Sequence, residues 1–162
     1  MNTFRENVIS WSRTVPVFFR ICPITKFKIH RDAENLLKLN IFSSIIVFSI
    51  GAISAILLAL TRWNAVQLLT AEWYYRILTS HGINMLIFFI LFFEMALFYH
   101  SGPIVLNCRL PVPIFGWAAF FLKLCGVFLV EYTIFSGHAD VLFTSYVPLK
   151  AHLLYYAGIA LF

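Results

Sequence analysis

The sequence predicts an all-α membrane protein: a polytopic transmembrane helical bundle with three full spans and a truncated fourth. Of its 162 residues, 61% are apolar and 12% are charged, whereas soluble globular domains carry about 25% charged residues. Three apolar stretches each reach the length of about 20 residues that a helix needs to cross the hydrocarbon core. Seven of the twelve basic residues precede the first stretch, an asymmetry typical of membrane topology.

Residues 1–38 are expected to form a basic cytoplasmic or interfacial segment. Its charges leave no continuous apolar core of the kind that a secretory signal needs. The apolar side chains of this segment are expected at the headgroup boundary, with the basic ones facing anionic lipid. The apolar ones are Trp11, Val17, Phe18 and Phe19, and the basic ones are Arg5, Arg13, Arg20, Lys26, Lys28, Arg31 and Lys38.

Residues 39–162 are expected to form the transmembrane domain. Its full spans are predicted at about 39–60, 77–99 and 114–135. Small residues around Gly51 would let another helix pack closely against the first span. Basic residues near the spans place the N-terminus in the cytoplasm by the positive-inside rule. His81, at the head of the second span, then lies near the outer face.

A fourth apolar segment, 149–162, follows Pro148, whose missing amide proton is harmless at a helix start. The twelve residues from Ala151 to Phe162 extend about 18 Å at 1.5 Å per residue, which is short of the roughly 30 Å of the hydrocarbon core. Open helix ends in hydrocarbon are costly. We therefore expect this span to be incomplete and the chain to be the N-terminal part of a longer protein.

The sequence motifs that are typical of several functional classes are absent from this chain. Basic residues beyond the N-terminal segment are scattered, which argues against nucleic-acid binding. The GxSxG, HExxH, P-loop and dinucleotide-binding motifs are absent, and Cys22, Cys108 and Cys125 form no CxxCH motif. Any enzymatic activity would therefore need a cofactor held between the spans.

Ionisable residues inside the spans mark candidate functional positions, because such residues are costly in lipid. His81 begins the second span, and Gly82 removes side-chain bulk beside it. An imidazole with a cleared flank suits axial coordination of haem iron. A hydrogen bond from the ring to a carbonyl or to water at the interface is the alternative.

Three further charged residues lie within the predicted spans. Glu94 and Lys123 can form an ion pair across adjacent antiparallel helices, or they can relay protons. Glu131, near the outer end of the third span, is expected at a solvated helix end.

Two stretches together resemble a known family. LTSHGINMLIFF, residues 78–89, resembles the second transmembrane helix of subunit I of haem-copper terminal oxidases, where a histidine followed by glycine ligates the low-spin haem. VLFTSYVPLKAHLLYYAG, residues 141–158, resembles the connection into the fourth helix of that family. The resemblance covers about residues 39–162.

The resemblance is closest to the ba3-like, or B-type, branch of this family. The loop HSGPIVLNCRLPVP lacks the long motif rich in glycine, asparagine and proline that A-type enzymes carry after helix two. Val147 stands where the family usually has the first of two prolines. Nitric oxide reductases share the histidine of helix two, so they stay an alternative relative.

The resemblance implies a role for several residues. His81 would be an axial ligand of a low-spin haem of a or b type, and Gly82 would give its ring room. Tyr146, Pro148 and Leu149 would lie in an outer loop near the oxygen-reducing region or the haem edge. The second low-spin ligand, the high-spin haem and the copper site of the family lie on later helices, so they would belong only to the full-length protein.

The function that the resemblance implies is that of a respiratory oxidase. Electrons from cytochrome c or a similar donor would pass through the low-spin haem toward reduction of oxygen to water, coupled to proton translocation. The implied partners are other oxidase subunits, such as a subunit II-like protein, and membrane lipid, in a prokaryotic plasma membrane. A nitric oxide reductase-like subunit and a non-redox structural membrane subunit are the alternatives.

Overall fold

The computed structural model describes residues 19–162 except 25, 27, 107 and 109. Trp11, Val17 and Phe18, which were expected at the headgroup boundary, lie outside the described residues, as do Arg5 and Arg13.

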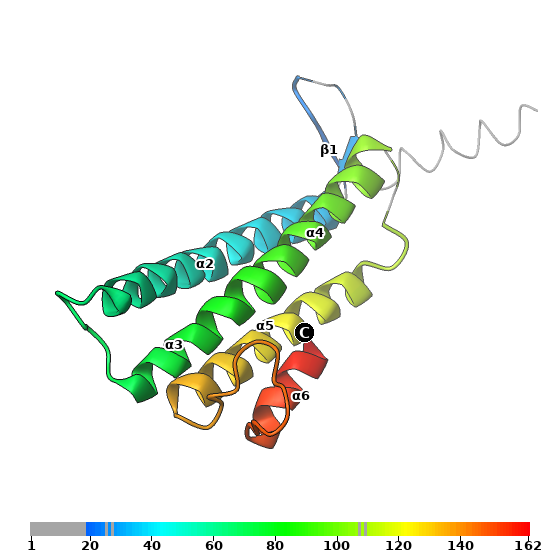
Figure 1. Ribbon diagram of the computed structural model, residues 1–162. Helices are drawn as coiled ribbons and strands as arrows, with labels where there is room; N and C mark the ends of the chain where they lie inside the picture. The colour runs from blue at the N-terminus through cyan, green and yellow to red at the C-terminus, as the bar shows by residue number, and fades with distance from the viewer. Residues whose placement is uncertain (1–18, 25, 27, 107, 109) are drawn as a thin grey trace, which may run out of the picture.

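The described chain is a bundle of helices with one small β-hairpin at its N-terminal end (Figure 1). Its helical elements are α2 (Arg31–Arg62), α3 (Ala71–Ile83), η1 (Asn84–Phe88), α4 (Phe89–Tyr99), η2 (His100–Val105), α5 (Pro113–Phe135) and α6 (Leu153–Leu161). The segments α3, η1, α4 and η2 follow one another without a break and form one long rod. The predicted all-α transmembrane bundle is thereby confirmed.

Within the described residues, three rods are long and apolar enough to cross a membrane, namely Arg31–Arg62, Ala71–Val105 and Pro113–Phe135. The first begins eight residues before its apolar stretch. Asp32 and Glu34 lie in its first turn, where acidic side chains interact favourably with the helix dipole. The helix therefore extends into the segment that the apolar pattern alone assigned to the N-terminal region.

The N-terminal hairpin pairs β1 (Phe19–Ile21) with β2 (Lys28–His30) in antiparallel register. The Glu34 carboxylate accepts hydrogen bonds from Arg20 at 2.8 Å and from Lys38 at 2.7 Å. The bond from Arg20 fastens the hairpin to the start of α2, and the bond from Lys38 lies within α2. The sequence did not predict these strands, because three residues are too few for a period-two pattern to be recognised.

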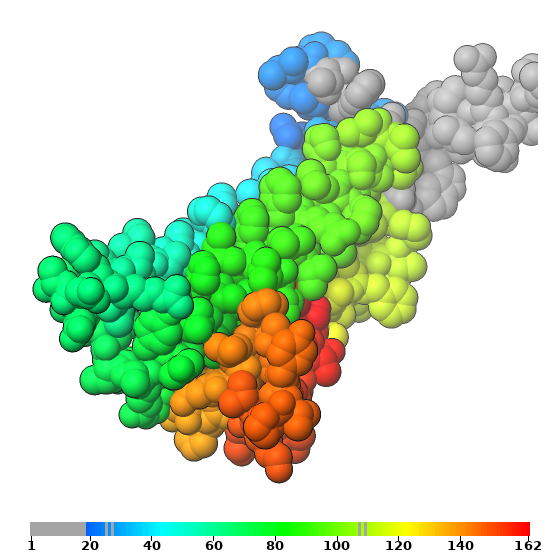
Figure 2. All heavy atoms as spheres, viewed as in Figure 1, coloured from blue at the N-terminus to red at the C-terminus, as the bar shows by residue number. Residues whose placement is uncertain are grey.

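The two ends of the bundle differ in what covers them. One end, called here the hairpin end, carries β1 and β2; the other, called the loop end, carries the α2–α3 connection and the α5–α6 connection, residues 136–152. Figure 2 shows the α5–α6 connection, in orange, lying over this end of the bundle. Its Leu142 amide donates to the Thr79 hydroxyl at 3.0 Å, so the connection is fixed to α3.

The inner face of α2 is small and polar, whereas its outer face is large and apolar. Ser44, Gly51 and Ser54 are buried, but Phe42 is 63% exposed and Ile53 is 60% exposed. Lipid tails are as apolar as a protein core, so large apolar residues gain little by facing inward, and small residues let helix backbones approach. This arrangement is expected for a membrane helix.

Larger side chains fill the space between α4 and α5. Phe88 and Phe92 are fully buried, and the ring of Phe162 contacts both, with centroid separations of 4.6 and 5.1 Å. The end of α6 is thereby packed into the same core.

Helices α5 and α6 meet at two glycines, which is the basis of a first prediction. A Cβ atom on Gly126 would lie 2.5 Å from the backbone oxygen of Gly158. Gly126→Ala is therefore expected to push the helices apart and to lower the free energy of unfolding by about 1–3 kcal/mol. Denaturation in mixed micelles, followed by tryptophan fluorescence, measures this change.

Gly102→Ala is the matched control, because a Cβ atom at Gly102 has no neighbour within 4 Å. Equal stability of the two variants would contradict the close approach of α5 and α6.

Candidate functional site

His81 lies on α3, in the half of the rod nearer the loop end, and is partly buried. Its Nδ1 atom is 2.9 Å from the backbone oxygen of Gly51 in α2. A carbonyl oxygen can only accept, so Nδ1 carries the ring proton and donates it. The Nε2 atom then holds a free lone pair, and it has no hydrogen-bond partner among the described residues.

This arrangement combines the two alternatives that the sequence left open for His81. The ring does donate to a carbonyl, but through one nitrogen only. A histidine that ligates a metal usually donates its other N–H to a carbonyl or carboxylate, which fixes its tautomer and orientation. The geometry of His81 therefore fits a metal ligand that coordinates through Nε2.

Gly51 makes this contact possible. A Cβ atom at Gly51 would lie only 2.7 Å from the Sδ atom of Met85, which lies one helical turn beyond His81. The missing side chain lets α2 and the rod approach closely enough for the carbonyl to reach the imidazole. The sequence indicated Gly51 as a packing position but gave no sign of its hydrogen bond.

Gly82 has a contact that the sequence did not predict. A Cβ atom at Gly82 would lie 2.9 Å from the Cβ atom of Phe143 and 2.8 Å from its ring. The space left by the missing side chain is thus filled by the α5–α6 connection. Gly82 therefore admits this connection against α3.

The loop residues that the resemblance singled out are exposed. Tyr146 is 73% exposed, Leu149 is 41% exposed, and the Leu149 amide donates to the Tyr146 carbonyl at 2.9 Å. Within the described part of the chain, no hydrogen bond or ring contact joins Tyr146, Pro148 or Leu149 to His81.

The expected ion pair between Glu94 and Lys123 does not form. The Lys123 ammonium is buried, donates to the Asn40 side-chain oxygen at 2.7 Å and lies 4.6 Å from the ring centre of Phe92. Glu94 is exposed. Phe92 and Glu94 are two residues apart, which is about 200° around a helix, so the face that reaches Lys123 turns Glu94 away.

A π-helical segment lies between His81 and Glu94. The five residues of η1 follow His81 within the same rod. A π turn contains about one residue more than an α turn, which shifts all later side chains around the axis. Side chains beyond Phe88 therefore do not keep the α-helical spacing of 100° per residue relative to His81. Such segments are frequent at functional sites.

Glu131 was expected at a solvated helix end, and this was wrong. Its carboxylate accepts from the Asn84 amide at 2.5 Å and from the Ser80 hydroxyl at 3.2 Å. Both donors belong to the rod of the second span, so this contact joins α5 to it. The sequence contains a signal for this contact, because Ser80 and Asn84 are polar residues that lie four positions apart on one face of an apolar span.

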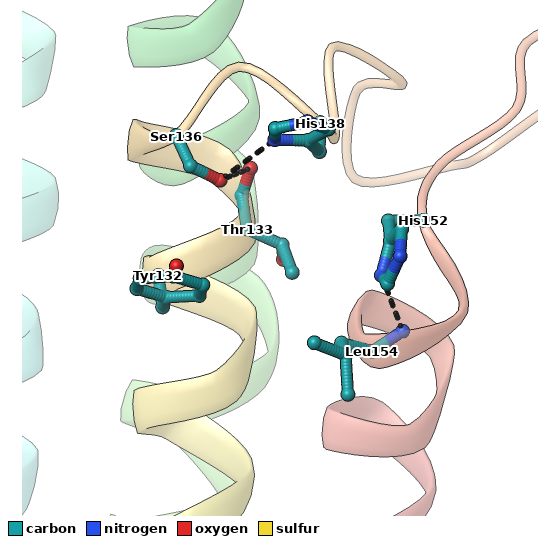
Figure 3. Close-up of a pocket in the computed structure, with 6 residues that line it drawn as sticks. All are labelled: Tyr132, Thr133, Ser136, His138, His152 and Leu154. Carbon is teal, nitrogen blue, oxygen red and sulfur yellow. Dashed lines mark hydrogen bonds between the residues drawn. The ribbon is translucent and has the colours of Figure 1, made fainter.

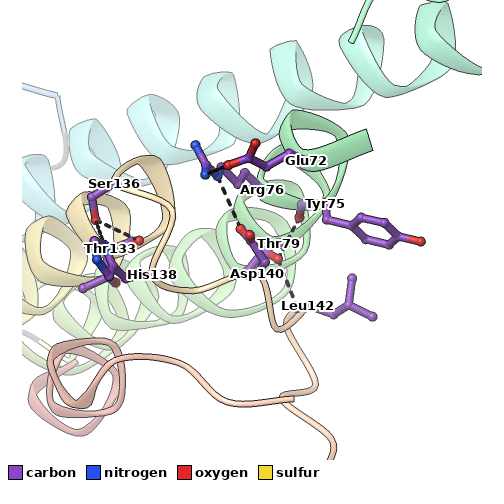
Figure 4. A network of polar contacts seen from close by, with 9 residues as sticks. All are labelled: Glu72, Tyr75, Arg76, Thr79, Thr133, Ser136, His138, Asp140 and Leu142. Carbon is purple, nitrogen blue, oxygen red and sulfur yellow. Dashed lines mark hydrogen bonds and ion pairs between the residues drawn. The ribbon is translucent and has the colours of Figure 1, made fainter. Parts of the chain in front are cut away.

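A polar network fixes the α5–α6 connection to α3 (Figure 4). The guanidinium of Arg76 pairs with Glu72 on its own helix and lies 3.6 Å from the carboxylate of Asp140 in the connection. Together with the bond between Thr79 and Leu142, this network holds the connection in place.

No group of three or more histidine, cysteine, aspartate or glutamate side chains gathers within the part of the chain that the structure describes. These residues therefore form no cluster of the size that a multi-ligand copper centre needs.

The fold and this geometry define a polytopic helical membrane protein whose second membrane rod presents one oriented imidazole. Residues 35–162 match the family described as "Cytochrome C and Quinol oxidase polypeptide I". The chain belongs to this family, and the predicted haem-copper oxidase subunit I-like identity is confirmed.

Two similar proteins extend this comparison. Cytochrome c oxidase subunit 1 of Thermus thermophilus is 32% identical over 91 residues, which are 55% of this chain and 16% of that relative. The structure of a heme-copper terminal oxidase dimer gives a TM-score of 0.72 at 24% identity, over 82% of this chain and 23% of the other. The chain thus spans less than a quarter of either protein.

The contact between Lys123 and Asn40 gives a second prediction. Asn40→Leu removes the hydrogen-bond acceptor that the ammonium has inside the bundle, so the free energy of unfolding should fall by about 1–3 kcal/mol. Adding Lys123→Met is expected to restore stability, because removing both polar partners of a buried pair can be nearly neutral.

Asn35→Leu is the matched control, since Asn35 is exposed on the same helix. Unfolding in mixed micelles measures all variants. If Asn40→Leu were no less stable than Asn35→Leu, the contribution of this hydrogen bond would be disproved.

Proposed function

We propose that the chain is part of the catalytic subunit of a haem-copper respiratory oxidase and that His81 is an axial ligand of its low-spin haem, of a or b type. The observation that carries the proposal is the hydrogen bond from Nδ1 of His81 to the Gly51 carbonyl. It leaves Nε2 free for the iron. When bound, such a haem supplies one-electron transfer, and its ligands and surroundings set the potential.

The residues of this chain hold and orient the imidazole. The Gly51 carbonyl fixes the ring and its tautomer, and Met85 packs against Gly51 where the helices cross. We further infer that Tyr146, Pro148 and Leu149 lie close to a haem edge or the oxygen-reducing region in the complete protein.

The complete protein is proposed to pass electrons from cytochrome c or a similar donor to oxygen, forming water and translocating protons. Copper, the high-spin haem and the second low-spin ligand would come from parts of the oxidase outside this chain. A subunit II-like protein is the proposed partner. The basic N-terminal segment supports a cytoplasmic N-terminus in a prokaryotic plasma membrane, which directs the loop end outward.

The family match argues against a non-redox structural subunit. The choice between oxygen and nitric oxide depends on the high-spin site, and the described residues favour neither substrate directly. The similarity to a cytochrome c oxidase subunit supports oxygen.

His81→Ala tests the proposed ligand in the purified full-length complex. The substitution removes the imidazole, so the reduced-minus-oxidised spectrum should lose the band of the six-coordinate low-spin haem. His100→Ala is the control, because His100 is exposed at the other end of α4 and should leave the band intact. An unchanged low-spin band in His81→Ala would rule out the assignment.

A separate prediction concerns the hydrogen bond to Gly51. In Gly51→Ala the new methyl group meets the Sδ atom of Met85, so α2 must move away and weaken the bond to His81. A weaker bond makes the imidazole less basic, which should raise the midpoint potential of the low-spin haem in a spectroelectrochemical titration.

Met85→Ala in the same chain removes the clash and should return the potential toward its original value. Gly102→Ala is the control, because a Cβ atom at Gly102 has no neighbour within 4 Å. A potential that stays shifted in the double variant would mean that the clash with Met85 is not the cause.

A further inference from the structure

A pair of histidines, His138 and His152, faces a pocket at the loop end and is distant in the sequence from His81. The pocket has a volume of about 180 Å³ and lies between the end of α5 and the start of α6 (Figure 3). Its lining residues are Tyr132, Thr133, Ser136, His138, His152 and Leu154. Both imidazoles are exposed, so a solute can reach them directly.

We propose that His138 and His152 bind a divalent first-row transition-metal ion such as Zn²⁺. The site is independent of the proposed haem ligand and uses neither His81 nor Gly51. Imidazole nitrogen is a preferred ligand for Zn²⁺ and Cu²⁺. Water and the hydroxyl groups of the pocket can complete the coordination.

The separation of the two rings suits one bridging ion. Their centroids are 6.1 Å apart, with the planes inclined at 74°. A Zn²⁺ ion bound at about 2.1 Å to a ring nitrogen lies about 3.2 Å from the ring centroid. Two rings on one ion are then about 5.2 Å apart at a tetrahedral angle and about 6.4 Å apart when opposed. The observed separation falls between these limits, so the rings would have to approach by about 0.9 Å to hold an ion at a tetrahedral angle.

The backbone holds the two residues together before any ion binds. The His152 amide donates to the His138 carbonyl at 2.8 Å, although the residues are fourteen positions apart. Little of the chain therefore has to be reorganised on binding, which lowers its entropic cost.

The environment of His138 sets its tautomer for binding. The Ser136 hydroxyl donates to the Thr133 carbonyl at 3.1 Å, so its oxygen is free to accept from Nδ1 of His138 at 3.0 Å. The proton then lies on Nδ1, and Nε2 carries the lone pair that a metal needs. This is the same kind of outer-shell support that orients histidine ligands in known metal sites.

His152 also caps helix α6, and metal binding would remove this cap. Its Nδ1 atom accepts from the Leu154 amide at 3.2 Å and caps the start of α6. Coordination through Nε2 requires the ring proton to move from Nε2 to Nδ1, which ends this cap. No proton is released, and one long hydrogen bond is exchanged for a metal–nitrogen bond.

Zn²⁺ titration of the complete membrane complex in nanodiscs, after EDTA treatment, tests the proposal by calorimetry. The variants His138→Gln and His152→Asn each remove one imidazole, and asparagine keeps an oxygen that can cap α6. Loss of outer-shell support alone changes metal affinity about 10-fold to 100-fold. Each variant should therefore raise the Kd for Zn²⁺ at this site by at least about tenfold.

The variant with both substitutions measures Zn²⁺ binding at any other site in the complex. His100→Ala should bind Zn²⁺ with the same affinity as the unaltered protein. Hydrogen exchange in residues 139–151 should slow when Zn²⁺ binds to the unaltered protein but not to the double variant. Unchanged Zn²⁺ affinity in His138→Gln or His152→Asn would overturn the proposal. An equal loss of affinity in His100→Ala would overturn it as well.

Discussion

The crossing of α2 with the rod of the second span at Gly51 is the contact on which the rest of the structure depends. The Gly51 carbonyl accepts a hydrogen bond from His81, and the missing side chain admits Met85. A helical carbonyl has a second lone pair beyond the one used by its own helix. This single glycine therefore sets the distance between two helices and the tautomer of the imidazole.

Polar contacts between helices complete the bundle. Lys123 donates to Asn40 of α2, and Glu131 accepts from Asn84 of the rod. The neutral amides of these two residues therefore link α5 to α2 and to the rod. Burial of apolar surface contributes little to helix association in lipid, whereas hydrogen bonds and close backbone approach contribute more. The polar residues within the spans thus specify how the helices are arranged.

The sequence predicted the fold class because composition and span length act independently of tertiary contacts. It was less successful where the direction of a side chain mattered. Glu94 was paired with Lys123, but Lys123 contacts Asn40 and Phe92, and Glu94 is exposed. Glu131 was placed in solvent, because its donors lie 47 and 51 residues away in the chain. The hairpin of β1 and β2 was too short to leave a pattern.

The sequence by itself determined that this chain crosses the membrane as helices and that a histidine opens its second span, because the bilayer imposes length and apolarity locally. Only the tertiary structure decided which ring nitrogen of His81 is free, what fills the space beside Gly82 and which residues accompany Lys123. Each of these depends on the distance and rotation between helices. Small residues, a π-helical segment and the α5–α6 connection set that geometry together, and no local pattern records it.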